Sequence, residues 1–278
     1  DVQLDLPNTL IGLLSARISR LSNQEQRILQ FAAVIGTVFW SKVLAVLVED
    51  EKNIEENLTS LQRARLIRER GLTPELGTEY VFISALIRDA AYESLLSSSR
   101  ANFHLRAANY LEAYISEQAL NQYHGIIAYH FREAGECQKE IFHTLLAAEN
   151  AKRLYANAEA IHQYNLALRA IQEIDGCGSI PEQHLINEWR LEALSGLGQT
   201  YFGIGEITQA EKYLRQAVKL GREIGINPLA LTRLFYWLGE VLFWQNQYEE
   251  PIHLGEEGLY YLGESNKNIE AALMNQLV

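Results

Sequence analysis

Histidine and cysteine are the side chains of this sequence best suited to metal binding or nucleophilic catalysis. A zinc site carried by a helix needs two histidines four residues apart and a further ligand. His124 and His130 are six residues apart, and His143 and His162 are nineteen apart, so neither pair has that spacing. Cys137 lacks the matched histidine and carboxylate of an activated nucleophile. We therefore expect structural or surface roles for these side chains, with no metal site and no catalytic residue.

Cysteine content and hydropathy bear on the compartment. Cys137 and Cys177 are too few for a disulfide framework. No basic and apolar leader is present, and no apolar stretch approaches the ~18 residues of a membrane span. The longest apolar run, Phe31–Trp40, is broken by Gly36 and Thr37 and predicts a core helix. These features favour a reducing, cytoplasmic location.

The charge balance disfavours several functions. The chain has 35 acidic against 24 basic side chains, a net charge of −11, which argues against general binding of nucleic acid. Carboxylate runs such as Glu49–Glu51 have the pattern of solvated helix faces and caps. No phosphate-binding G-x-x-x-x-G-K-[ST] loop occurs, so we expect no enzyme activity and no cofactor in this chain. Its first residue is Asp1 and its single methionine is Met274, which favours a piece of a longer protein.

Residues 1–83 predict a winged-helix domain. Ser22 and Glu25 form a capping-box pattern at the start of a first helix. Ser41 can cap a second helix, and a third is expected over 54–64. Alternation over 66–70, turn residues over 71–78 and a β-type run over 80–83 predict one small hairpin around a long loop. Three helices followed by two strands is the order of a winged helix.

Helical patterns continue from residue 84 to the end. Residues 84–118 predict a helical connector with helices over 85–96 and 102–115, and residues 119–278 predict a tetratricopeptide-like superhelix. One frame of small and large residues recurs at Ala148, Gly198 and Gly239. The two intervals between these positions are unequal, and both exceed the ~34 residues of the standard repeat. The fold class expected is therefore mainly α.

Small residues in this frame predict where paired helices approach each other. We expect Gly198 to face Ala210 and Ala217 within one hairpin. The third repeat has Pro251, Gly255 and Gly258 in the corresponding places, which weakens its second helix by propensity. Residues 266–278 predict the beginning of another helix, so the repeats are truncated at the C-terminal end.

The order of several motifs resembles that of a known family. The motifs are Leu6-Pro7-Asn8-Thr9-Leu10, Leu14-x-x-Arg17-Ile18-x-x-Leu21-Ser22, Ala32-Ala33-Val34-Ile35-Gly36-x-x-Phe39, Tyr80-Val81-Phe82-x-x-Ala85-Leu86-Ile87-x-Asp89-Ala90-Ala91-Tyr92-x-x-Leu95-Leu96, and His104 with Ala108, Leu111 and Glu112. Together with the repeats they are similar to the region after the nucleotide-binding core in bacterial signal-transduction ATPases with numerous domains (STAND).

The resemblance implies a parent protein with an upstream ATPase domain that binds ATP or ADP and Mg²⁺. Output domains in such parents include nucleotide cyclases, kinases and DNA-binding regulators. Family members often carry a histidine at the place that Ser84 holds here. This departure puts direct sensing of nucleotide phosphate by the winged helix in doubt.

Four arginines gather at the end of the third helix and in the first strand. We expect Arg63, Arg65 and Arg68, with Arg70 beside them, to contact the ATPase domain or its nucleotide phosphates. In DNA-reading winged helices this helix enters the major groove, so a DNA-binding transcriptional regulator is the alternative. Residues 1–118 carry 15 acidic against 12 basic side chains, which disfavours it. A solvated face is the third interpretation.

The first helices of the repeats, beginning near residues 141, 191 and 232, are expected to line a groove that binds a protein or small-ligand partner. The predicted partner-binding residues are Lys152, Arg153, Gln199, Arg233, Tyr236, Trp237, Glu240, Phe243 and Trp244, with Glu149 and Glu192 beside them. Aromatic residues and arginine are typical of binding hot spots. The alternative is that these aromatic residues form core between repeats. Exposure of Trp237 and Trp244 distinguishes the two interpretations.

The sequence thus favours a non-catalytic regulatory arm of a signalling ATPase. It would couple binding on the repeats to the upstream nucleotide domain, without contact to a membrane. A DNA-binding regulator and an enzyme are the rivals, and the second would require a deep pocket with several histidines and carboxylates.

Overall fold

The computed structural model describes residues 12–14, 16–48, 53–177 and 181–263. The motif over 6–10, the acidic run over 49–51 and the helix expected over 266–278 lie outside these residues. Contacts divide the chain into two compact units, residues 1–136 and 137–278. The described part is mainly helical with one small sheet, as the sequence predicted. The finer division at residues 83 and 118 stays a prediction.

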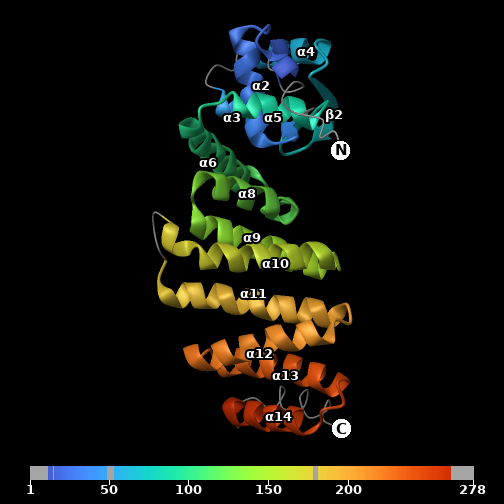
Figure 1. Ribbon diagram of the computed structural model, residues 1–278, viewed down its shortest axis with the longest axis vertical. Helices are drawn as coiled ribbons and strands as arrows, with labels where there is room; N and C mark the ends of the chain where they lie inside the picture. Colours follow the sequence, from blue (N-terminus) through green and yellow to red (C-terminus); the bar gives the residue numbers. More distant parts are fainter. Residues whose placement is uncertain (1–11, 15, 49–52, 178–180, 264–278) are drawn as a thin grey trace, which may run out of the picture. The chain divides into compact units, whose positions relative to one another are not determined.

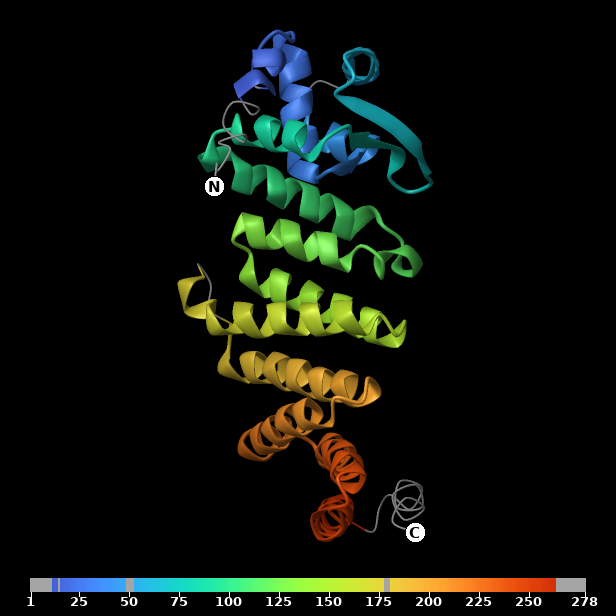
Figure 2. The ribbon, with the colours of Figure 1, turned by 45° about the vertical axis from the view of Figure 1, so that its right-hand side comes forward.

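The first unit contains the sheet and the helices around it (Figure 2). Its elements are α2 (Asn23–Ile35), β1 (Val38–Trp40), α3 (Ser41–Leu47), α4 (Ile54–Arg63), β2 (Ile67–Thr73), β3 (Gly77–Phe82), α5 (Ala85–Glu93), α6 (Ser97–Tyr114), α7 (Glu117–Leu120) and α8 (His124–Ala134). The capping box at α2 is confirmed: the Ser22 hydroxyl accepts from the Glu25 amide, and the Glu25 carboxylate accepts from the Ser22 amide.

A strand lies where the apolar run Phe31–Trp40 predicted one helix. Gly36, with φ at 148°, follows the last residue of α2. The next residues form β1, which pairs antiparallel with β3 and places Phe39 opposite Tyr80. The rings of Phe39 and Tyr80 stack at 5.5 Å, and Phe39 is fully buried. The expected two-stranded hairpin is therefore a three-stranded antiparallel sheet in the order β1-β3-β2.

The β2–β3 hairpin is longer than the sequence predicted. Its strands pair as far as Thr73 and Gly77, so the loop expected over 71–78 shortens to residues 74–76. Ser41 does not cap α3. Its hydroxyl accepts from the Thr78 amide at 3.0 Å and so connects α3 to β3.

One apolar core serves all of the first unit. Helices α5, α6 and α8 contribute buried alanines and large side chains, including Ala91, Ala107, Ala108 and Phe131, to the cluster that α2, α3 and the sheet also form. Small residues on these helices allow close packing.

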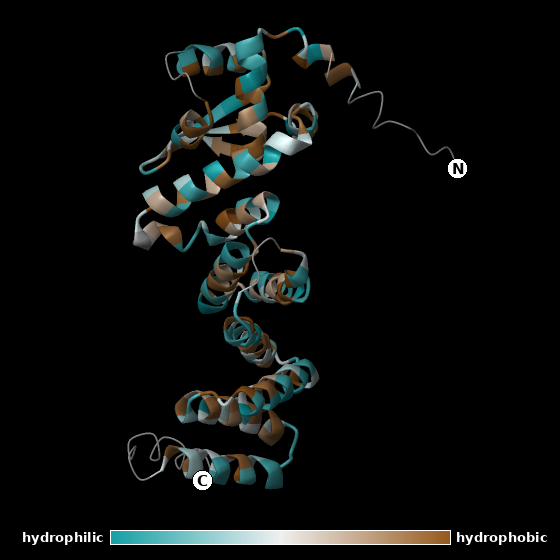
Figure 3. Ribbon diagram, turned by 90° about the vertical axis from the view of Figure 1, so that its left-hand side faces the viewer, coloured by the Kyte–Doolittle hydropathy of each residue, from teal (hydrophilic) through white to brown (hydrophobic). Residues whose placement is uncertain are grey.

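The described residues of the second unit form three antiparallel helical hairpins (Figure 1). They are α9 (Cys137–Arg153) with α10 (Asn157–Gln172), α11 (Gln183–Gly203) with α12 (Ile207–Ile224), and α13 (Pro228–Trp244) with α14 (Glu249–Leu262). A short 3₁₀ helix, η2 (Ile174–Gly176), follows α10. Apolar and hydrophilic residues alternate around these helices (Figure 3).

The turns inside the hairpins repeat at the same intervals as the small residues. Each first helix is followed by a residue with positive φ, namely Tyr155, Gly205 and Asn246. The spacing of these three residues along the chain is identical to that of Ala148, Gly198 and Gly239. The hairpins are therefore related by the frame that the sequence predicted.

Two glycines of α11 mark the closest helix crossings. A Cβ at Gly198 would lie 2.5 Å from Leu214 Cγ, so this glycine faces Leu214, which shares the buried face of α12 with Ala210 and Ala217. A Cβ at Gly196 would overlap the buried ring of Tyr164 on α10. Glycine thus lets α11 approach both of its neighbours.

Cys137 and Cys177 form a disulfide, although their small number was interpreted as favouring a reducing compartment. Their Cα atoms are 6.2 Å apart, and the bond joins the start of α9 to the residue after η2. The hairpin brings these two points together because its helices are antiparallel. The cysteine pair therefore gives no support for a reducing compartment.

The last hairpin is intact despite its proline and glycines. Pro251 lies in the first turn of α14, where its missing amide proton has no partner within the helix anyway. Gly258 allows close contact with α13: the Thr232 hydroxyl donates to the Gly258 carbonyl at 3.3 Å.

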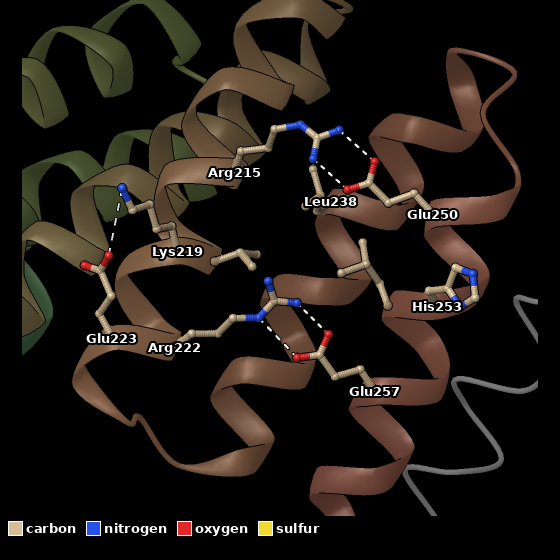
Figure 4. Close-up of a pocket in the computed structure, with 10 residues that line it drawn as sticks. Arg215, Lys219, Arg222, Glu223, Leu238, Glu250, His253 and Glu257 are labelled. Carbon is tan, nitrogen blue, oxygen red and sulfur yellow. Dashed lines mark hydrogen bonds and ion pairs between the residues drawn. The ribbon is translucent and has the colours of Figure 1, made fainter.

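Two ion pairs join α14 to α12 on the solvent side (Figure 4). Arg215 binds Glu250 through both carboxylate oxygens, at 2.6 and 2.8 Å, and Arg222 binds Glu257 at 3.1 and 2.5 Å. The pairs are seven residues apart on each helix, so they follow one face. We call them the α12–α14 ion pairs.

Candidate partner-binding groove

A groove of about 560 Å³ lies between α11 and α13, the first helices of two consecutive hairpins. Its lining residues are Glu188, Leu191, Glu192, Ser195, Gln199, Ile226, Asn227, Ala230, Arg233, Leu234 and Trp237. Asn227 begins the α13 wall by capping that helix, since its side-chain oxygen accepts from the Ala230 amide at 2.9 Å. The volume is within the usual range of ligand sites.

A hydrogen-bonded network connects the groove to α9. Lys152 lies 2.8 Å from Glu149 and donates to the Gln199 side-chain oxygen at 3.1 Å. Gln199 in turn donates to the Ser195 hydroxyl at 2.9 Å. The buried Tyr164 hydroxyl donates to Glu149 at 2.9 Å. These bonds hold the Gln199 amide in a fixed orientation at the groove.

The charged form of Glu192 is disfavoured by its surroundings. Its side chain is accessible from the groove. Partial desolvation by the surrounding helices raises its pKa, the nearby charge of Glu149 raises it further, and Lys152 partly offsets both. The pKa of Tyr164 is also raised, first by burial and then by the charge of Glu149.

The structure brings together some of the residues predicted to bind a partner. Gln199, Arg233 and Trp237 line the groove, and Lys152 joins them through Gln199. Arg153 instead points to Asn150 of its own helix, at 3.2 Å.

The remaining predicted residues lie on α13 and do not line the groove. Tyr236 packs its ring against Trp237 at 5.3 Å, and Glu240 is half-buried. Phe243 and Trp244 are 58% and 67% exposed at the end of the helix. Trp237 is half-buried and Trp244 is open, so neither is sealed beneath neighbouring helices.

Sequence reasoning missed several lining residues. Glu188, Ser195, Ala230 and Leu234 were not singled out. A signal existed for the first two: residues 188, 192, 195 and 199 follow helical spacing and share one face of α11. The small and apolar residues of α13 carry no such signal, because they have the pattern of ordinary core.

The three arginines expected to make interdomain or phosphate contacts lie in the first unit. Arg63, Arg65 and Arg68 are exposed, and within the described residues none makes an ion pair. Arg70 differs, because it pairs with Glu79 at 3.4 Å. Arg65 directly follows the C-cap residue of α4 and has φ at 53°.

Ser84 has a local structural role. Its hydroxyl accepts from the Leu86 amide at 3.2 Å and caps α5. The Ser84 side chain is thus engaged at a helix start.

The described residues contain no group of three or more His, Cys, Asp or Glu side chains placed to hold a metal ion. They also contain no helix that combines the length and apolar character needed to cross a membrane.

Comparisons with known proteins give distant likenesses only. No family model matches the sequence, and no curated protein matches it. Similar solved structures include BtubC (BKLC) from P. vanneervenii, with a TM-score of 0.39 and 13% identity, covering 92% of this chain and 93% of that one. They also include a STAND protein with a tetratricopeptide repeat sensor from Pyrococcus horikoshii, with a TM-score of 0.36 and 14% identity. This chain is covered to 90% and spans 46% of that protein. Neither likeness bears on function.

Proposed function

We propose that this chain is a non-catalytic regulatory and interaction arm of a multidomain signalling ATPase. The helical repeats bind a protein partner, and the first unit transmits that event to an upstream nucleotide-binding domain. ATP, ADP and Mg²⁺ belong to that domain and not to this chain.

The groove between α11 and α13 carries the proposal. It is open, it has both polar and apolar walls, and the Lys152–Gln199 bond fixes part of its polar lining. A preorganised groove binds a partner without first ordering its own side chains. The exposed side chains of Phe243 and Trp244, at the end of α13, offer further contact surface for a partner.

The first unit supports the role of a lever. We propose that α2 to β3 form a winged helix, because the order helix–strand–helix–helix–strand–strand and the sheet order β1-β3-β2 suit that fold. Partner binding can shift the ATPase between states only by its difference in affinity for them. Ser84 is engaged in capping α5, so the unit acts through packing rather than through direct sensing of phosphate.

The experiment compares partner capture and nucleotide binding on the same protein. A peptide array is probed with the wild-type chain, with the groove variant Gln199→Ala/Trp237→Ala and with the distant α12 variant Lys219→Ala/Glu223→Ala. We expect peptides that the wild type and the α12 variant bind and the groove variant loses. Equal binding by all three proteins contradicts the proposal. In equilibrium dialysis with Mg-ATP we expect no retention, and tight Mg-dependent retention contradicts a non-catalytic arm.

A DNA-binding regulator is the second candidate, favoured by the exposed side chains of Arg63, Arg65 and Arg68. Against it, α4 begins with exposed Glu55 and Glu56, which would repel phosphates. A gel shift on duplex DNA that weakens with salt and is lost in Arg63→Ala/Arg65→Ala would support this candidate. No shift at low salt would reject it.

A further inference from the structure

The two walls of the α11–α13 groove differ in chemistry. The α11 wall presents Glu188, Glu192, Ser195 and Gln199 along one helix face. The α13 wall presents mainly Ala230, Leu234 and Trp237, with Arg233 as its one charged group among the lining residues. An occupant that fits both walls must itself be polar on one side and apolar on the other.

The charges of the groove are not balanced internally. Glu149 is paired with Lys152 at 2.8 Å. In the part of the chain that the structure describes, Glu188 and Glu192 make no ion pair, and neither does Arg233. Two carboxylates that make no ion pair on one wall therefore face a single cation on the other.

Glu192 would gain from a cationic partner. Its raised pKa reports that partial desolvation and the charge of Glu149 disfavour the carboxylate form. An ammonium or guanidinium group brought beside it would reverse that penalty and release the proton from the fraction that is protonated. Binding of such a group is therefore linked to proton release.

We propose that the groove binds an extended peptide segment in which basic and apolar residues alternate. A Lys or Arg side chain of the segment lies between Glu188 and Glu192, the neighbouring apolar side chain packs on Leu234 and Trp237, and Arg233 donates to a main-chain carbonyl. Successive side chains of an extended chain point in opposite directions, which matches two walls of opposite character. The proposal rests on the proposed interaction function and adds the chemistry of the partner.

Three labelled peptides test this specificity. Each is a fluorescein-labelled ten-residue peptide in which Leu alternates with Lys, with Glu or with Gln, and binding to the full chain is followed by anisotropy. We expect the Lys/Leu peptide to bind about tenfold more tightly than the Glu/Leu peptide. Its affinity should weaken as salt is added, because the carboxylates remain accessible to solvent.

Matched variants locate the binding. Glu188→Gln/Glu192→Gln should lose about tenfold in affinity for the Lys/Leu peptide, whereas Glu223→Gln/Glu256→Gln, which makes the same charge change elsewhere on the second unit, should not. All four side chains are exposed, so both variants should fold, and circular dichroism checks this. Trp237→Ala should weaken the binding of every peptide that enters the groove.

Each result has one meaning. If all three peptides bind equally and Trp237→Ala loses this binding, the groove does bind peptides, but the proposed preference for basic residues is wrong. Preference for Glu/Leu, or unchanged Lys/Leu binding by Glu188→Gln/Glu192→Gln, overturns the specificity as well. Failure of every peptide to bind, together with no groove-dependent peptide on the array, overturns both proposals.

Discussion

The Nδ1 atoms of His104 and His130 lie 2.8 Å apart in the core of the first unit. A hydrogen bond between two ring nitrogens needs one that carries a proton and one that is bare, so at least one of the two rings is neutral. The Tyr92 hydroxyl lies 3.0 Å from the other nitrogen of His104 and completes the arrangement. Both histidines are fully buried, which disfavours a charge on either ring.

Acid should destabilise the first unit through these two histidines. Burial, with the charges of Arg88 and Arg100, lowers the pKa of His104 to about 4. Burial, with the charges of His104 and Arg88, lowers the pKa of His130 to about 3. The unfolded chain takes up protons below about pH 6.5 while the folded one does not, so the free energy of unfolding falls as the pH is lowered from there. The expected slope is at most ~1.4 kcal/mol per pH unit for each histidine.

Urea unfolding between pH 7 and pH 5 measures this slope above the range in which most carboxylates titrate. The control is His184→Gln/His253→Gln, which removes two exposed histidines that lie outside the first unit. A free energy of unfolding that stays constant over this range contradicts the prediction. Imidazole ¹⁵N spectra give a direct check, because both buried rings should remain neutral at pH 5.

Replacing Gly196 should separate α11 from α10. In Gly196→Ala the new methyl group overlaps the ring of Tyr164, which is buried and held by Glu149, and we expect a loss of about 1–3 kcal/mol in the free energy of unfolding. Gly203→Ala on the same helix is the control, because nothing lies within 4 Å of its Cβ. Alanine there should be neutral or stabilising by up to about 1 kcal/mol. Similar effects at the two positions would contradict the close crossing.

Breaking the Cys137–Cys177 bond should loosen the first hairpin of the second unit. The bond closes a loop across a sequence separation of 40 residues, so its loss should cost about 2–4 kcal/mol through the entropy of the unfolded chain. Hydrogen exchange of α9 and α10 amides should accelerate in Cys137→Ser/Cys177→Ser and, equally, in the wild type under reducing agent. Protection that the reductant does not alter would show that the bond contributes nothing.

The α12–α14 ion pairs should contribute modestly and depend on salt. Arg215 and Glu250 are 41% and 42% exposed, so Glu250→Gln and Glu257→Gln should each cost only about 0.2–1 kcal/mol. Hydrogen bonding to Arg215 lowers the pKa of Glu250, so the contribution is present above pH 4.5 and is lost as the pH falls below it. Urea titrations at low and high salt measure the effect, with Glu188→Gln, an exposed carboxylate that makes no ion pair among the described residues, as the control. An equal loss in Glu188→Gln would show that the pairing is not the cause.

Local patterns predicted the helices and their repeat, because periodicity and small residues are written into neighbouring positions. The frame through Ala148, Gly198 and Gly239 recurs in the positive-φ residues after each first helix. The strand β1 escaped prediction because a short part of an apolar run becomes a strand only by pairing with β3, which follows it in the chain after α3, α4 and β2.

The groove was only partly predictable for the same reason. Gln199, Arg233 and Trp237 were found from the repeat frame, and the Glu188–Gln199 face of α11 could have been inferred from helical spacing. Which side chains of α13 stand opposite that face depends on how two helices pack, and no local pattern encodes it. The Cys137–Cys177 bond was missed likewise, since it depends on the fold of the α9–α10 hairpin.

Helix α13 contributes both to the groove and to the contact with α14. One side of it holds Arg233 and Trp237 at the groove, and another holds Thr232 and Phe235 against Gly258 of α14. A ligand that widens the groove must displace α13 toward α14, and the α12–α14 ion pairs resist this displacement. The ion pairs of Arg215 and Arg222 therefore oppose widening of the groove, although neither arginine lines it.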